Sequence, residues 1–183
     1  MGPELMSFLG FPGKTFGNID KRLSVSLQDH NRGKINEEDF WTLYREIIGK
    51  DLPPHDESLF GKFFKPKPDE PTVKIVRALK EAGIRVVVGS NTIDSHYEIL
   101  ERMGIFDDFD KVYASQIMGL AKPDPAFYEY ILREEGVNAP EAFFTDDLEE
   151  NIDSAVKAGL KAFLYTDAEA LKMQLSALGL LAA

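Results

Sequence analysis

The stretch that decides the fold is Phe143–Asn151, FFTDDLEEN, in which an apolar strand runs directly into two adjacent carboxylates, Asp146 and Asp147. Open α/β sheets bind their ligands at the carboxyl ends of the strands, where side chains from several strands converge. Two adjacent carboxylates repel each other, and a bound cation relieves that repulsion. Asp146 and Asp147 are therefore candidate metal ligands. The alternative interpretation is an acidic helix start that the helix dipole favours.

Two further segments mark the same edge of the predicted sheet. Residues 84–92, IRVVVGSNT, read as a buried strand that ends at Ser90 and Asn91, both candidate donors to an anion. Residues 119–132, GLAKPDPAFYEYIL, place Lys122 just before a helix that begins with proline. Taken singly, Ser90 or Asn91 is explained by capping of the next helix, and Lys122 by a solvated surface charge. The three segments together favour a single ligand site at this edge of the sheet.

The same segments resemble the haloacid dehalogenase (HAD)-like hydrolase superfamily, in particular its phosphatases with a small helical cap. Ser90 matches the second motif of that family, Lys122 the third, and the Asp146–Asp147 pair the fourth. Asn151 fits the DDxxxN pattern, where it either orients the acidic loop or simply occupies the first helical turn. The resemblance covers roughly residues 20–170, and the combination of motifs is far more specific than any one of them.

The resemblance implies hydrolysis of a small phosphomonoester through an aspartyl-phosphate intermediate, with Mg²⁺ as cofactor. Ser90, Asn91 and Lys122 would bind the phosphate, and Lys122 would also be catalytic through its pairing with the nucleophile. Asp146 and Asp147 would bind Mg²⁺. Dehalogenase and phosphonate-cleaving chemistries share the same core and remain open, as does the identity of the substrate.

The family's first motif is an apolar strand that ends in Asp-x-Asp and supplies the nucleophile. The opening MGPELMSFLGFPGKTFGNID, whose acids are Glu4 and Asp20, contains no such strand. We therefore expect this chain to start after the first core strand, to be inactive alone and to bind Mg²⁺ weakly. Whether it is an enzyme stays open. The alternative is a non-catalytic phosphate-binding or protein-interaction protein, a pseudo-phosphatase.

A missing central strand would leave two unpaired strand edges, at about 1–3 kcal/mol for each unsatisfied buried group. Three ways of filling the gap are open. The natural protein has residues that this sequence lacks, or the two half-sheets close on each other, or another chain donates a strand, which includes a homo-oligomer. We favour the first.

The organisation of the chain predicts an α/β protein with a Rossmann-like parallel sheet, a core that lacks its first strand, and a small N-terminal helical cap. The cap is expected over residues 1–66 and the core over 67–183, with Lys65–Pro68 as the linker. Asn36 is expected to cap a cap helix. The expected core helices are 71–82, 94–103, 124–135, 150–158 and 168–178, and the strands are 84–90, 111–115, 142–146 and 161–165. Glycines at 83, 104, 136 and 159 stand where helices should stop.

Composition excludes several function classes. The chain has 183 residues, a formal charge of -10 and a hydrophobic content of 44%, which indicates a folded domain that binds neither nucleic acid nor anionic membranes. The absence of Cys excludes disulfides and thiolate chemistry, and a cytoplasmic location is the default. His30, His55 and His96 lack metal-ligand spacing. No strand is followed by GxGxxG, and the order of motifs is the reverse of that in receiver domains.

Overall fold

The chain folds into two compact units in a computed structural model that describes residues 2–181. Unit 1 contains the residues up to Lys67 together with Asn91–Gly104 and Ala114–Gly119. Unit 2 contains Pro68–Ser90, Ile105–Tyr113 and the residues from Leu120 onward. The proposed cap (1–66) and core (67–183) remain a prediction about domains.

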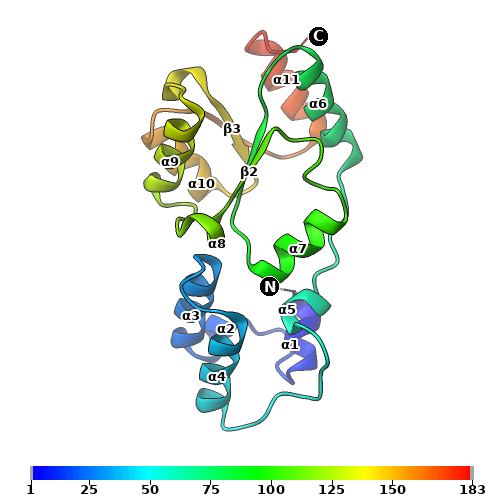
Figure 1. Cartoon of the computed structure of the whole chain (residues 1–183), viewed down its shortest axis with the longest axis vertical. Helices are drawn as coiled ribbons and strands as arrows, with labels where there is room; N and C mark the ends of the chain where they lie inside the picture. The colour runs from blue at the N-terminus through cyan, green and yellow to red at the C-terminus, as the bar shows by residue number, and fades with distance from the viewer. Residues whose placement is uncertain (1, 182–183) are drawn as a thin grey trace. The chain divides into compact units, whose positions relative to one another are not determined.

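Helices make up unit 1 (Figure 1). They are α1 (Pro3–Phe8), α2 (Phe16–Ile19), α3 (Lys21–Asn31), α4 (Glu37–Ile48), α5 (Leu59–Lys62), α7 (Asp94–Arg102) and α8 (Ser115–Met118). Helix α4 begins at the predicted cap, since the Asn36 side chain accepts a hydrogen bond from the Asp39 amide at 2.9 Å. The Asp39 carboxylate in turn accepts from the Asn36 amide at 3.1 Å, which completes a capping box.

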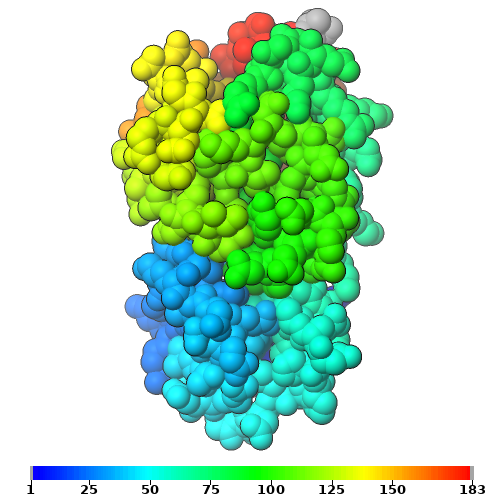
Figure 2. Space-filling model, in the orientation of Figure 1, coloured from blue at the N-terminus to red at the C-terminus, as the bar shows by residue number. Residues whose placement is uncertain are grey.

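Aromatic side chains fill the core of unit 1. Phe16, Phe40, Trp41, Tyr44 and Phe60 are all buried, and their rings meet mostly edge to face. Figure 2 shows one face of the residues that surround this core, coloured blue to cyan.

The Glu37 carboxylate links helices α4 and α5 of unit 1. Glu37, in the first turn of α4, accepts hydrogen bonds from the Trp41 indole at 2.8 Å, the Ser58 hydroxyl at 2.6 Å and the Leu59 amide at 3.0 Å. It thereby satisfies free N–H groups at the start of α5.

Unit 2 alternates helices and strands. Its elements are α6 (Glu70–Glu81), β1 (Val87–Ser90), β2 (Lys111–Ala114, whose last residue belongs to unit 1), α9 (Pro125–Glu135), a 3₁₀ turn (Ala139–Glu141), β3 (Phe143–Asp146), α10 (Glu149–Lys157), β4 (Lys161–Leu164) and α11 (Ala168–Ala177). Helices α6 and α11 lie side by side (Figure 1), and Ile75, Leu79, Leu171 and Leu175 form a buried cluster. The expected α/β class is confirmed.

The strands form two separate pairs. Strand β1 pairs with β2, and β3 pairs with β4 in parallel, with Asp146 opposite Leu164. Within residues 2–181 no ladder joins β1 to β3, so the two half-sheets do not close directly on each other. Of the three fillings considered, direct closure is the one that this arrangement contradicts.

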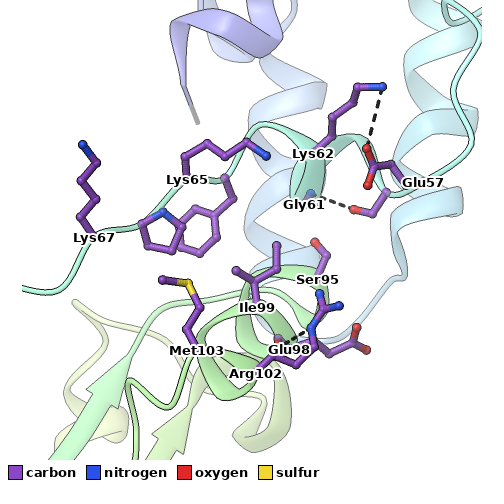
Figure 3. Close-up of a pocket in the computed structure, with 13 residues that line it drawn as sticks. Glu57, Gly61, Lys62, Lys65, Lys67, Ser95, Glu98, Ile99, Arg102 and Met103 are labelled. Atoms are coloured by element: carbon purple, nitrogen blue, oxygen red, sulfur yellow. Dashed lines mark hydrogen bonds and ion pairs between the residues drawn. The ribbon is translucent and has the colours of Figure 1, made fainter.

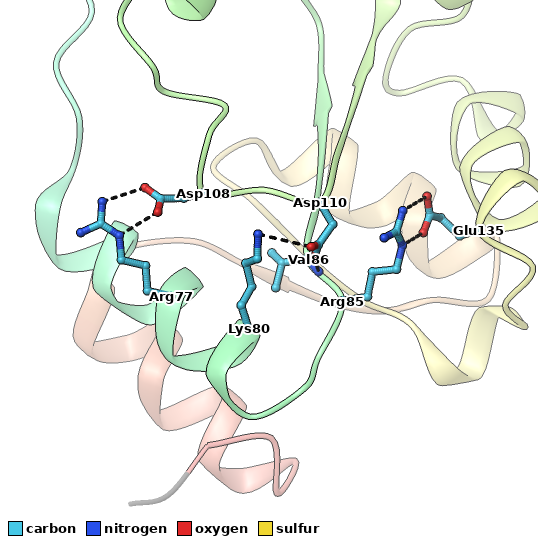
Figure 4. Close-up of polar contacts among 7 residues, drawn as sticks. All are labelled: Arg77, Lys80, Arg85, Val86, Asp108, Asp110 and Glu135. Atoms are coloured by element: carbon cyan, nitrogen blue, oxygen red, sulfur yellow. Dashed lines mark hydrogen bonds and ion pairs between the residues drawn. The ribbon is translucent and has the colours of Figure 1, made fainter.

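Polar contacts hold the amino ends of β1 and β2 together (Figure 4). The Asp110 amide donates to the Val86 carbonyl and the Val86 amide to the Asp110 carboxylate, both at 2.8 Å. Arg77 and Asp108 form a bidentate ion pair beside them, and Lys80 contacts Asp110 at 3.2 Å. The Asp110 carboxylate occupies the Val86 amide, so strand β1 begins at the next residue, Val87. The predicted strand began at residue 84.

The glycines expected to stop helices do so. Gly83, Gly104, Gly136 and Gly159 have φ values of 78°, 68°, 66° and 90°, the left-handed region that glycine enters without strain. Among the helices of residues 2–181, none has both the length and the apolar character that a bilayer crossing needs.

We predict that His96 makes unit 1 less stable in mild acid. Burial lowers the pKa of His96 and outweighs the opposing effect of the Phe60 carbonyl at 3.3 Å, and the ring stacks on Phe64. The pKa of His96 is lower in the folded state than in the unfolded state, where it is about 6.5. The stability is therefore highest above pH 6.5 and decreases as the pH falls below about 6.5, because the unfolded state then binds the proton more readily. Urea unfolding from pH 8 to pH 5 should show a smaller loss for His96→Gln than for the wild type. An NMR titration that places the His96 pKa above 6.5 would contradict this account.

Candidate functional site

Lys122 lies at the centre of the candidate site. Its ammonium donates hydrogen bonds to the Asp146 carboxylate at 2.6 Å and to the Gly89 carbonyl at 2.9 Å. Gly89 is in β1 and Asp146 ends β3, so one side chain contacts a strand of each pair. The Lys122 and Asp146 side chains are only 11% and 7% exposed, which makes this a buried ion pair.

Two aromatic rings enclose this ion pair. The Lys122 ammonium lies 6.0 Å from the centre of the Phe127 ring and 5.8 Å from that of Phe144. Phe127 approaches β1 closely because residue 89 is glycine, where an added Cβ would lie 3.0 Å from the ring. The low-dielectric surroundings strengthen the attraction between the charges.

Asp146 is held by three donors. Besides Lys122, its carboxylate accepts from the Asn151 amide group at 2.8 Å and from the Leu148 backbone amide at 3.0 Å. Burial raises the pKa of Asp146, but the bonds from Lys122 and Asn151 outweigh it, and the pKa lies below its usual value. Asp146 is therefore ionised at neutral pH.

Asn151 both belongs to a helix and orients the acidic loop. It is buried in the first turn of α10, and its side chain donates to Asp146. Its backbone carbonyl accepts from the Tyr128 hydroxyl at 2.8 Å. Burial and the nearby Asp146 raise the pKa of Tyr128, so the phenol stays protonated and remains a donor.

Of the other predicted residues, Ser90 and Asp147 make no side-chain hydrogen bond to this network within the described part of the chain. Ser90 is the last residue of β1, and its half-buried side chain makes no hydrogen bond to any described residue. Asp147 is exposed beside Asp146, and Asn91 is an exposed residue of unit 1. The structure thus brings Lys122, Asp146 and Asn151 into contact.

The described residues do not supply a magnesium site by themselves. Both Asp146 oxygens already accept hydrogen bonds from nitrogen donors, which leaves Asp147 as the freer carboxylate. Within residues 2–181 there is no group of three acidic, His or Cys side chains that could hold a metal ion. Magnesium usually binds one or two carboxylates and completes its octahedral shell with water and phosphate oxygens.

Sequence reasoning missed the Gly89 carbonyl and the ring neighbours of Lys122. A backbone acceptor has no side-chain signature, so no residue pattern marks Gly89 as a partner. Phe127 and Tyr128 are both buried.

Comparison with known proteins decides the family. A family model described as haloacid dehalogenase-like hydrolase matches residues 10–159. The chain belongs to this family. The expected membership of the HAD superfamily and the HAD-like α/β fold are thereby confirmed.

Several relatives of this HAD-like chain are named as phosphatases. The sesquiterpene phosphatase astK of Aspergillus oryzae is 34% identical over 157 residues, which cover 83% of this chain and 78% of the relative. A glyceraldehyde 3-phosphate phosphatase of Methanothermobacter thermautotrophicus is 28% identical over 175 residues. This match covers 81% of this chain and 77% of the relative.

A solved HAD family enzyme of Bacteroides thetaiotaomicron, in complex with magnesium, has a TM-score of 0.71 at 24% identity. The match covers 89% of this chain and 83% of that one. At this identity the similarity shows the fold.

We predict that Lys122→Met destabilises this HAD-like chain by about 3 kcal/mol, because it leaves the buried Asp146 carboxylate without its cation. Lys157→Met is the matched control, since Lys157 is exposed in the last turn of α10 and should change stability by about 0.5 kcal/mol or less. Urea unfolding of both variants measures the difference. Equal stabilities would show that the ion pair contributes nothing.

The same variant should alter the response to acid. The low pKa of Asp146 contributes stability above the unfolded value of about 3.9, and this contribution is lost as the pH falls through the folded pKa. Lys122→Met should raise the Asp146 pKa in a carboxyl ¹³C NMR titration. An unchanged pKa would mean that Asn151 and the Leu148 amide alone keep the carboxylate ionised.

Proposed function

We propose that this chain carries the phosphate-binding part of a HAD-type phosphatase that acts on a small phosphomonoester. The observation that supports this most is the Lys122 ammonium, held between β1 and Asp146 at the carboxyl ends of two strands. Phosphoryl transfer depends mainly on positioned cations and donors that stabilise negative charge on oxygen. Lys122 would supply the cation, and Ser90 and Asn91 would supply donors.

The Ser90 hydroxyl suits this role because it is not engaged elsewhere. It follows Gly89, whose carbonyl contacts Lys122, and it makes no hydrogen bond within the described residues. A hydroxyl without an internal partner is available to donate to a phosphate oxygen. Asn91 is exposed and follows directly in the chain.

The relatives support the reaction class more than the substrate. One is named a sesquiterpene phosphatase and another a glyceraldehyde 3-phosphate phosphatase, and sesquiterpenes and glyceraldehyde differ greatly in size and polarity. We therefore define the substrate only as a phosphorylated small molecule. Asp147 and the remaining lone pairs of Asp146 would bind Mg²⁺ weakly at best.

The experiment separates phosphate binding from turnover. Ser90→Ala should weaken binding of inorganic phosphate by about tenfold, the effect of one hydrogen bond to a charged group, without changing stability. Ser7→Ala, in α1, is the control and should leave the affinity unchanged. Calorimetric titration measures both. Equal affinity in wild type and Ser90→Ala would remove Ser90 from the site.

Turnover by the 183-residue chain alone should be negligible. Its sequence offers no strand that ends in the family's Asp-x-Asp motif, and loss of a covalent nucleophile costs on the order of 10⁶ in kcat. Incubation with p-nitrophenyl phosphate and Mg²⁺ should release no nitrophenol above background. Magnesium-dependent release would overturn the prediction and point to another nucleophile.

A second candidate function is protein interaction through the strand edges. The two strand pairs are not joined to each other within residues 2–181, and a free edge of β1 or β3 offers backbone N–H and C=O groups for strand addition. A homo-oligomer or a partner strand would satisfy them. Light scattering during gel filtration should then report a mass above 20.5 kDa. A single peak with the monomer mass of 20.5 kDa would exclude self-association.

A further inference from the structure

A cavity lies entirely within unit 1, between the segment around α5 and helix α7. Its volume is about 680 Å³, within the range of small-molecule sites. None of the residues that line it is one of the candidate site residues described above. It is therefore not explained by phosphate binding at Lys122.

Apolar side chains form one wall of this cavity. Ile99 and Met103 point from α7 toward the segment that carries Lys65 and Lys67 (Figure 3). Phe64 also lines the cavity and stacks on His96 of α7, with ring centres 3.9 Å apart. Met103 remains 48% exposed, so part of its apolar surface is accessible to a ligand.

Cations surround the apolar wall. Lys62, Lys65, Lys67 and Arg102 line the cavity, against the two carboxylates of Glu57 and Glu98, although the whole chain has a formal charge of -10. A local excess of positive charge is thus concentrated at a cavity of an acidic protein. Charge complementarity favours an anion here.

These cations are little neutralised by the protein itself. Lys65 and Lys67 have no carboxylate within 4.0 Å in the described part of the chain, and Lys62 contacts Glu57 only at 3.9 Å. The Arg102 Nε donates to the Glu98 carbonyl at 3.2 Å, a neutral acceptor. Their charges therefore remain available to a ligand.

Packed helices form the base of the cavity. Helices α5 and α7 approach closely at Gly61, where an added Cβ would lie 3.4 Å from the Ser95 Cβ and 3.5 Å from the Ile99 Cδ1. The Gly61 amide is held by the Ser58 hydroxyl at 2.9 Å. An apolar wall on packed helices and a cationic rim on the adjoining segment form an amphipathic pocket.

We propose that this pocket binds an organic anion with an apolar body, whose head group contacts the lysines while its chain covers Ile99 and Met103. A phosphate or a carboxylate head would meet the same cations. The head group would take up the rim charges, and burial of the chain would remove the exposed Met103 surface from water. The proposal does not depend on the proposed phosphatase function.

Decyl phosphate and decanoate, both used below the concentration at which they form micelles, are the probes. The full chain is labelled with ¹³C at the methionine methyls, and calorimetry measures affinity. The Met103 methyl should shift on addition of either probe. The methyl of Met173, which is also exposed but lies in α11, is the internal control and should not shift.

Substitutions test each half of the pocket. Lys65 and Lys67 are exposed, so the double variant Lys65→Gln/Lys67→Gln should fold normally and bind decyl phosphate about three- to tenfold more weakly. Met103→Ser should weaken binding by about tenfold. Lys14→Gln/Lys34→Gln, two exposed lysines outside the cavity, should bind as the wild type does.

Inorganic phosphate and decyl glucoside provide the opposing outcomes. If inorganic phosphate shifts the Met103 methyl as strongly as decyl phosphate does, or decyl glucoside as strongly as decanoate, the amphipathic pocket is refuted. Absence of the Met103 shift also refutes it. Loss of decyl phosphate binding in Ser90→Ala, with no effect of Met103→Ser, would assign the ligand to the Lys122 site and leave the phosphatase proposal intact.

Discussion

The arrangement of unit 2 depends on one buried ammonium group. Lys122 is almost enclosed, and its charge is compensated by the Asp146 carboxylate and the Gly89 carbonyl. A buried ion pair is a poor source of net stability, because the desolvation of both charges offsets most of their attraction. An arrangement that separates the end of β1 from the end of β3 leaves a buried charge without a partner.

The same interaction determines what the edge of the sheet can bind. With Asp146 committed to Lys122, Asn151 and a backbone amide, the acidic pair presents chiefly Asp147 to a cation. The Lys122–Asp146 pair is neutral as a whole, and Asp147 adds an exposed negative charge beside it. A cation site there would need further oxygen ligands from substrate, water or another segment.

The periodic part of the chain could be predicted well, and the reasons are local. From α6 onward each predicted helix and strand has a counterpart, because apolar periodicity and helix-stopping glycines are encoded in neighbouring residues. The start of β1 could not be predicted, since Asp110, more than twenty residues away, takes the Val86 amide. Helix α8 is too short to produce a periodic pattern.

The candidate site could be predicted only in its side chains. Lys122 and Asp146 are predictable because their types and order match a known family, whereas the Gly89 carbonyl has no sequence signature. The cationic pocket of unit 1 could not be predicted from the sequence for a related reason. Arg102 is about forty residues from Lys62, and the Lys65–Pro68 segment reads as an ordinary linker until the fold places α7 beside it.

The two ends of β1 are held by electrostatic contacts of different kinds. At its amino end Arg77, Lys80 and their aspartate partners are partly open to water, so added electrolyte screens them. At its carboxyl end the ion pair is enclosed by rings and is screened far less. Concentrated salt should therefore weaken the contacts at the amino end of β1 more than those at its carboxyl end. Amide protection against hydrogen exchange would then fall at the amino end and persist at the carboxyl end, within a strand of only four residues.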